Sequence, residues 1–185
     1  MNPGWLTGIV AVLLGGATLS ACSDVASDAS PSTVVEVQGT VIVVIDGDTI
    51  DAQLGPTRER IRLIGINSPE SVDLRKPIEC FGPEASTHLK ELLAQGSPIR
   101  VERDVEERDK YGRLLAYVFR GSDAVMVNLQ QAIDGFADTM DIRPNSTHAA
   151  AIRSAVDDAK LHQRGMWATC PATAATGAAG APGAT

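Results

Sequence analysis

The predicted fold rests on the segment Val44-Ile45-Asp46-Gly47-Asp48-Thr49-Ile50. β-Branched residues lead into this segment, two aspartates flank a glycine at its centre, and a second apolar run leaves it. An Asp-Gly pair between two such runs predicts a β-hairpin with a tight turn. The tip of the hairpin then carries carboxylates, which serve either as turn-forming groups or as ligands of a cation.

Further strands and helices are expected on both sides of this hairpin. The segment before it is rich in β-branched residues and is interrupted at Gly39, which suits a strand that bends at the corner of a barrel. Apolar residues at helical spacing, with turn residues at their ends, predict three helices further along the chain. We expect strands at residues 34–45, 49–54, 58–66, 98–103 and 113–120, helices at 80–96, 125–134 and 145–163, a charged loop at 104–110 and an irregular segment at 137–144.

This order of elements predicts the fold class. Three strands, a helix, two strands and two helices suggest an α+β domain, a five-stranded OB-fold β-barrel with three α-helices. Apolar residues make up 44% of the 185 residues and aromatic residues only 4%, so the core of the barrel should be aliphatic. Such barrels commonly bind nucleic acids or sugars, but the fold alone does not establish a function.

The first residues of the chain resemble an export signal. Residues 1–21 contain no charged side chain, and their apolar part spans about 17 residues, which suits a signal peptide better than a membrane span. It ends in Leu19-Ser20-Ala21-Cys22, which resembles the bacterial lipobox, where the cysteine is lipidated. We therefore expect a lipoprotein signal peptide at 1–21, a flexible tether at 22–33, and a protein anchored outside the cytoplasmic membrane through Cys22. An uncleaved anchor and ordinary secretion are the alternatives.

Export bears on the other two cysteines of the chain. If Cys22 carries a lipid, Cys80 and Cys170 are left as a possible disulfide outside the reducing cytosol, although two free thiols are the alternative. Residues 34–170 then form the folded domain. Residues 171–185 are only Ala, Gly, Thr and Pro, so we expect a disordered tail.

The charge of the chain restricts how it could bind nucleic acid. A formal net charge of -7 argues against loose attraction over the whole surface, so a polyanion needs a local cluster of arginines. Arg62 and Arg113 lie on predicted strands, and Asn67-Ser68-Pro69-Glu70 ends the third strand with an amide, a hydroxyl and a carboxylate. Each motif alone is more often a turn or a solvated face. Together with Asp48, they supply what metal-assisted phosphodiester hydrolysis needs.

Six blocks of residues carry a more specific signal because they occur in a fixed order. They are Ile45-Asp46-Gly47-Asp48-Thr49, Ile61-Arg62-Leu63-Ile64-Gly65-Ile66-Asn67-Ser68-Pro69-Glu70, Phe81-Gly82-Pro83-Glu84-Ala85-Ser86, Asp109-Lys110-Tyr111-Gly112-Arg113-Leu114-Leu115-Ala116-Tyr117, Arg143-Pro144-Asn145-Ser146-Thr147-His148 and Gly165-Met166-Trp167. This series resembles the thermonuclease family, also called micrococcal or staphylococcal nuclease-like, from about residue 34 to residue 167.

The resemblance implies a calcium-dependent OB-fold nuclease, expected to be a monomer, that cleaves DNA and RNA with little sequence preference. Its functional residues carry over by matching positions. The implied roles are calcium ligation by Asp48, Asn67 and the carbonyl of Ser68, action on the attacking water by Glu70, phosphate binding and transition-state stabilisation by Arg62 and Arg113, and contact with a terminal phosphate by Lys110 and Tyr111.

Three departures from the family pattern qualify this expectation. Asn67 stands where the type enzyme has aspartate, which predicts weaker calcium binding because one negative charge is lost. Two substrate-contacting tyrosines of the type enzyme have no counterpart in residues 139–143, and this chain is acidic where the type enzyme is basic. The alternative is therefore a catalytically weak or inactive OB-fold module that binds nucleic acid or protein.

Overall fold

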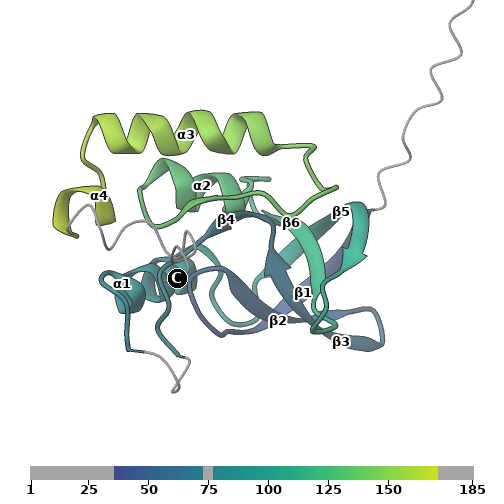
Figure 1. Cartoon of the computed structure of the whole chain (residues 1–185). Helices are drawn as coiled ribbons and strands as arrows, with labels where there is room; N and C mark the ends of the chain where they lie inside the picture. The colour runs from purple at the N-terminus through teal and green to yellow at the C-terminus, as the bar shows by residue number, and fades with distance from the viewer. Residues whose placement is uncertain (1–35, 73–76, 171–185) are drawn as a thin grey trace, which may run out of the picture. The chain divides into compact units, whose positions relative to one another are not determined.

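Five strands close into a barrel in the computed structural model, in the order β1-β2-β3-β6-β5 (Figure 1). β3 and β6 run parallel, and the other neighbouring strands are antiparallel. This arrangement confirms the predicted five-stranded barrel. The strands are β1 (Glu36–Val44), β2 (Thr49–Leu54), β3 (Thr57–Leu63), β5 (Pro98–Arg108) and β6 (Leu114–Arg120).

The structure describes residues 36–72 and 77–170. The predicted signal peptide, the lipidation site at Cys22, the tether and the tail at 171–185 lie outside these residues. Within the described ranges, no helix is both long enough and apolar enough to cross a membrane.

Three helices accompany the barrel, as the sequence predicts, and each is shorter than expected. α3 runs across α2, and α2 also contacts the barrel strand β6 (Figure 1). α1 contacts both α2 and β1. The helices are α1 (Gly82–Leu92), α2 (Val127–Ile133) and α3 (Ala149–Leu161), followed by the single turn α4 (Met166–Thr169).

The third predicted strand, 58–66, is not continuous. The chain leaves the barrel after Leu63, and Gly65 adopts a φ of 84°, a left-handed conformation that glycine tolerates. The next residues form β4 (Gly65–Asn67), which pairs with β7 (Asp138–Met140) in a separate two-stranded sheet. A Cβ at position 65 would lie 2.5 Å from Cδ1 of Ile152, so glycine also lets α3 approach. This break places Asn67 opposite Asp138 rather than along the barrel wall.

Two segments predicted to be irregular contain strands, so those predictions were wrong. Most of the expected loop at 104–110 belongs to β5, where an irregular register between Arg103 and Arg108 brings Arg108 opposite Leu114. Arg108 also forms a two-pronged ion pair with Glu59, with N–O distances of 2.9 and 2.8 Å. The segment at 137–144 contains β7, which completes the small sheet with β4.

The last helix begins at Ala149, later than the expected start at residue 145. Its N-cap is His148, without a side-chain capping bond. The carboxylate of Asp104 instead accepts hydrogen bonds from the backbone N–H groups of Ser146 (2.8 Å) and Thr147 (2.9 Å). The segment before α3 is therefore tied to β5 by a residue distant in sequence.

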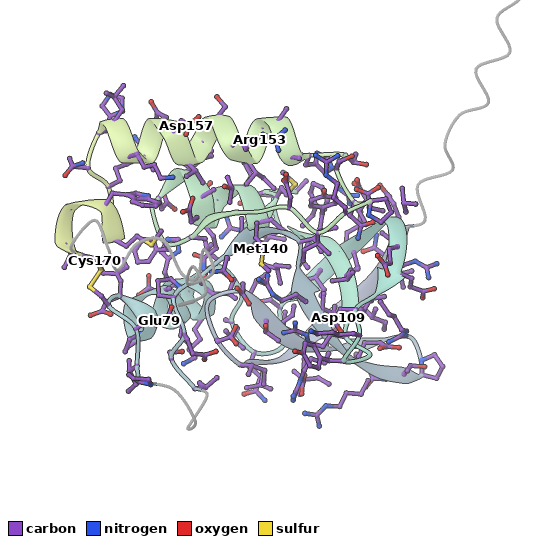
Figure 2. All side chains as sticks on the ribbon, viewed as in Figure 1. Glu79, Asp109, Met140, Arg153, Asp157 and Cys170 are labelled. Atoms are coloured by element: carbon purple, nitrogen blue, oxygen red, sulfur yellow. A yellow bond between two sulfur atoms is a disulfide. The ribbon has the colours of Figure 1, made fainter. Side chains whose placement is uncertain are left out.

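The core is aliphatic, and a disulfide closes the domain. Ile50, Ile61, Leu63 and Leu115 are fully buried, and Tyr117 is the largest side chain buried among the described residues. Cys80 and Cys170 form a disulfide with their Cα atoms 5.9 Å apart. Figure 2 shows the Cys170 end of this bond beside Glu79, so the end of α4 is joined to the segment that precedes α1.

Candidate active site

The hairpin tip between β1 and β2 holds Asp48, which is only 7% exposed. Its Oδ2 accepts a hydrogen bond from the backbone N–H of Ser68 (3.0 Å) and lies 3.0 Å from Nη2 of Arg62. Its Oδ1 accepts a hydrogen bond from the hydroxyl of Thr49 (3.0 Å). The carboxylate is thus fixed from three sides, and the hairpin is attached to the loop after β4.

Gly47 allows this close approach. A Cβ at position 47 would lie 2.6 Å from Cβ of Ser68 and 2.9 Å from Cβ of Ala85, so a larger residue would push the hairpin away. The carbonyl of Gly47 accepts hydrogen bonds from Oγ of Ser68 (2.9 Å) and Nε2 of Gln131 (2.6 Å). Contacts from both the β4 loop and α2 therefore set the position of the hairpin tip.

Arg62 is buried beside Asp48, with 5% of its surface exposed. Its Nη2 lies 3.0 Å from Oδ2 of Asp48 and 3.4 Å from Oδ1 of Asn67, and Nη1 donates to the carbonyl of Leu63. Sδ of Met140 lies 3.5 Å from the same Nη2. Oxygens from two of the predicted calcium ligands therefore converge on one positive charge.

The hairpin tip carries a second carboxylate, Asp46, whose Oδ1 accepts a hydrogen bond from the backbone N–H of Asp48 (3.0 Å). Burial, followed by the negative charge of Asp48, raises the pKa of Asp46 to about 6. Within the described residues, no group of three His, Cys, Asp or Glu side chains is placed so that it could hold a metal ion. Asp48, the Asn67 amide and the Ser68 carbonyl are nevertheless hard oxygen donors of the kind that calcium accepts.

Glu70 lies in the loop that follows β4, two residues after Ser68. Its Oε1 accepts hydrogen bonds from the backbone N–H groups of Ser71 and Val72, both 2.9 Å long. Its own backbone N–H donates to Oε2 of Glu79 (2.9 Å). Backbone N–H groups of this loop therefore hold the Glu70 carboxylate in place. Glu70 is close in sequence to the predicted ligands Asn67 and Ser68.

Arg113, Lys110 and Tyr111 form a second group, between β5 and β6. Nε of Arg113 donates to Oδ2 of Asp109 (2.7 Å). The Arg113 guanidinium and the Lys110 ammonium lie 5.5 and 5.1 Å from the centre of the Tyr111 ring. Figure 2 shows Asp109 at this end of the barrel, well away from Met140 near Arg62.

β3 links the two groups. Leu114 pairs with Ile61 in the parallel register, so Arg113, which precedes Leu114, lies next to Arg60 rather than next to Arg62. A pocket of about 290 Å³ lies here and is lined by Asp51, Arg58, Arg60, Tyr111, Gly112 and Arg113. The structure thus brings Asp48, Arg62, Asn67 and Ser68 together. It places Arg113, with Lys110 and Tyr111, in the turn between β5 and β6, beside Arg60 of β3.

The family of this chain can be identified by comparison with known proteins. A family described as staphylococcal nuclease homologue matches residues 60–169, which is more than half of the chain. The chain belongs to the staphylococcal nuclease family. This match confirms the resemblance drawn from the six sequence blocks.

Similar proteins agree with this membership. The chain is 37% identical over 127 residues to the thermonuclease of Staphylococcus hyicus, covering 69% of this chain and 73% of that protein. It is 39% identical over 124 residues to the thermonuclease of Staphylococcus intermedius, covering 67% and 72%. Endonuclease YhcR of Bacillus subtilis (strain 168) is 37% identical over 149 residues, 75% of this chain but 12% of that larger protein. Family and relatives together indicate nuclease function.

Three residues of this nuclease-family member contact the site without lying in any of the motifs that predicted it. Asp51 accepts hydrogen bonds from two arginines of the pocket, Gln131 donates one from α2 to the carbonyl of Gly47, and Sδ of Met140 contacts Arg62. Gln131 sits among apolar positions of a short helix, and Met140 lies in a segment predicted to be irregular. For Asp51, the one available signal was the alternation of residues on β2. Alternation shows which face a residue occupies, but it does not show which partner the residue has.

Proposed function

We propose that this nuclease hydrolyses the phosphodiester bonds of DNA and RNA with little sequence preference and uses calcium held by Asp48, Asn67 and the carbonyl of Ser68. One observation carries the proposal. Side-chain oxygens of Asp48 and Asn67 approach the same nitrogen of buried Arg62, so ligand oxygens and a phosphate-binding group occupy one place. Calcium bound there would polarise a phosphoryl oxygen.

The residues of the chain supply the rest of the chemistry. Arg62 is buried, so its charge acts where water screens it little, and its planar guanidinium suits two-pronged contact with a phosphate. Arg113, which immediately precedes β6, would reach the phosphate from the adjoining pocket and stabilise the charge that develops in the transition state. The Glu70 carboxylate would orient or deprotonate the attacking water.

Lys110 and Tyr111 would contact a terminal phosphate of the substrate. Tyr111 is 72% exposed, and the Lys110 ammonium lies beside its ring. An ammonium and a phenolic hydroxyl both donate hydrogen bonds to phosphate oxygens. These contacts would be made to the phosphate backbone of the nucleic acid and not to its bases, which is consistent with little sequence preference.

We propose that the protein acts as a monomer outside the cytoplasmic membrane, anchored by a lipid on Cys22. The segment Leu19-Ser20-Ala21-Cys22 supports this location. The Cys80–Cys170 disulfide also supports it, because disulfides persist in oxidising compartments and are rare in the cytosol.

A second candidate function is a binding module that has lost catalysis. The observation that favours it is Asn67, whose neutral amide stands at a predicted ligand position beside Arg62. Weak calcium binding would then leave a barrel that holds nucleic acid without cleaving it.

A digestion assay separates the two functions. The full-length chain, purified in a mild detergent, is incubated with plasmid DNA and with RNA in millimolar calcium or in excess chelator. We expect digestion of both substrates with calcium and none with chelator. Binding without digestion in calcium would support the non-catalytic module, and digestion in chelator would exclude the calcium mechanism.

The same assay tests Arg113. The change Arg113→Ala removes a group proposed to stabilise the transition state, and we expect the turnover rate to fall by about 100-fold or more. Arg153→Ala serves as the control, because Arg153 lies on α3 in an exposed ion pair with Asp141. Equal rates for the two variants would remove Arg113 from the mechanism.

A further inference from the structure

A buried carboxylate holds two arginines on one face of β2 and β3. The side chain of Asp51 is only 5% exposed, and it lies opposite Arg60 in the register of the two strands. Its Oδ2 accepts from Nη2 of Arg58 (2.7 Å), and its Oδ1 accepts from Nε of Arg60 (2.8 Å). Asp51 therefore fixes both guanidinium groups in place.

The two arginines remain open to solvent although Asp51 is buried. The side chains of Arg58 and Arg60 are 59% and 53% exposed. The bonds to Asp51 use one N–H group of Arg58 and two of Arg60, whereas a guanidinium carries five. Each arginine therefore keeps donors that a ligand in the pocket can reach.

The pocket in front of them also contains Arg113 and Tyr111, in a volume of about 290 Å³. Three arginines and one carboxylate line it, so the wall is positively charged in a chain whose net charge is -7. An acidic protein that acts on a polyanion needs its positive charge concentrated where the substrate lies. The pocket meets that need, because Arg113, which is proposed to act in catalysis, is one of its lining residues.

We propose that Arg58 and Arg60 form a phosphate subsite, which binds the backbone phosphate of a nucleotide flanking the scissile bond on a nucleic-acid strand. This inference rests on the nuclease function proposed above. Arginine matches the geometry of a phosphate with two parallel hydrogen bonds, and such contacts carry no base preference. Asp51 acts as a positioning residue, because it orders two long side chains before the substrate arrives.

Two substrates of different length test the subsite. A dinucleoside monophosphate has only the scissile phosphate, whereas a single-stranded hexanucleotide also has flanking phosphates. The full-length chain is compared with Arg58→Gln, which leaves both Arg60 bonds to Asp51, and with Arg58→Gln/Arg60→Gln. Arg120→Gln is the control, because Arg120 is paired with Asp123 and does not line the pocket.

The subsite predicts a loss that depends on substrate length. For Arg58→Gln, KM for the hexanucleotide should rise about three-fold or more relative to KM for the dinucleoside monophosphate, with kcat little changed, since uniform binding is lost. The double variant should show a larger rise. Equal losses on both substrates, or the same result for Arg120→Gln, would overturn the proposal.

A binding measurement in chelator separates the subsite from catalysis. Affinity for a labelled hexanucleotide is followed against salt, and the slope should become less steep by about 0.7 for each phosphate contact removed. Such a change in a chain that cleaves nothing would sustain the subsite while the proposed nuclease function fails. An unchanged slope in a folded variant would refute the subsite. Binding of inorganic phosphate is measured on the same variants. Variants that no longer bind inorganic phosphate but bind the hexanucleotide as tightly as before would also refute the subsite.

Discussion

Three aspartates near the site show how the partners of a carboxylate decide its role. Asp46 has another carboxylate as its neighbour, so burial and repulsion raise its pKa to about 6. Asp48 is held by Arg62, Ser68 and Thr49, which suits a fixed oxygen ligand. Asp51 has two arginines, which hold its pKa below the ordinary value. The same side chain thus serves as turn former, proposed ligand and counter-ion within six positions of one hairpin.

The change Asn67→Asp tests the proposed calcium site. A carboxylate restores a negative charge among the oxygen donors, so calcium should bind more tightly and half-maximal activity should require less calcium. Calcium titration of activity, with isothermal calorimetry on the same protein, measures the effect. Asn145→Asp is the control, because Asn145 bonds to Glu106 of β5, away from the hairpin. Calcium dependence identical to that of the unmodified chain would argue that Asn67 is not a ligand.

Asp51 should make stability depend on pH at the acid end. The hydrogen bond from Arg60, opposed by burial and aided by Arg58, lowers the pKa of Asp51 below 3.8 in the folded protein. The folded state therefore binds fewer protons than the unfolded state around that pH. This stabilisation is complete above about pH 5 and is lost as the pH falls below about 4 towards the folded pKa.

Replacing Asp51 with Asn should flatten this dependence. We expect the free energy of unfolding to fall less steeply between about pH 5 and pH 2, measured by urea unfolding at each pH. The matched control is Asp157→Asn, at an exposed position of α3 (Figure 2). A slope as steep as that of the unmodified chain would show that the arginine pair does not stabilise ionised Asp51.

At the level of helices and strands, the hairpin depends on α2 as much as on the barrel. Gln131 is fully buried on α2, and its Nε2 donates to the carbonyls of Gly47 (2.6 Å) and Ala85 (3.4 Å). Two carbonyl acceptors fix the orientation of the amide, so its oxygen faces Nδ1 of His88, which must carry the hydrogen. A buried polar chain thus joins α1 and α2 to the tip that holds Asp48.

The change Gln131→Leu should therefore destabilise the protein. The leucine has a similar volume but leaves the His88 nitrogen without this acceptor and removes one donor to Gly47, at a cost of about 1–3 kcal/mol. The free energy of unfolding in urea measures the loss. Gln130→Leu, one position earlier, removes only a hydrogen bond to Asp134 on the outer side of α2 and should cost less. Equal losses for the two variants would contradict a specific role for the hairpin contact.

For the domain as a whole, the disulfide joins parts of the chain that are far apart in sequence. Cys80 and Cys170 are separated by 90 positions, and a loop of that length constrains the unfolded chain by roughly 4–5 kcal/mol in the loop-entropy model. The bond also closes the domain beside α1, on the side where the Gly47 hairpin is held.

The double change Cys80→Ser/Cys170→Ser should lower the free energy of unfolding by about 2–5 kcal/mol. Urea unfolding with and without a reducing agent measures it. The reducing agent should destabilise the unmodified chain to a similar extent and leave the double variant unaffected. A reducing agent that destabilised both proteins alike would show that the loss does not come from this bond.

Local chemistry accounts for the parts of the fold that the sequence predicted. Local sequence neighbours determine the Asp-Gly turn, the β-branched runs and the helical apolar stripes. The barrel, its three helices and the hairpin at Asp48 could therefore be predicted from the sequence. The errors arose where distant partners decide the structure. β5 continues to Arg108 because Arg108 pairs with Leu114 of β6 beyond the irregular register, and residues 138–140 form a strand because β4 pairs with them.

The candidate site likewise has residues that the sequence predicted and contacts that only the folded structure decided. Asp48, Arg62, Asn67, Ser68, Glu70, Arg113, Lys110 and Tyr111 were predicted as candidates because ordered motifs mark residue types and their sequence order. Which of them meet depends on the parallel register of β3 and β6, which sets Arg113 beside Arg60 and leaves Arg62 with Asp48. Asp51 and Gln131 gained their roles in the folded chain alone. Cross-strand and helix-to-loop hydrogen bonds join residues that no local pattern relates, so folding had to bring those partners together before either role existed.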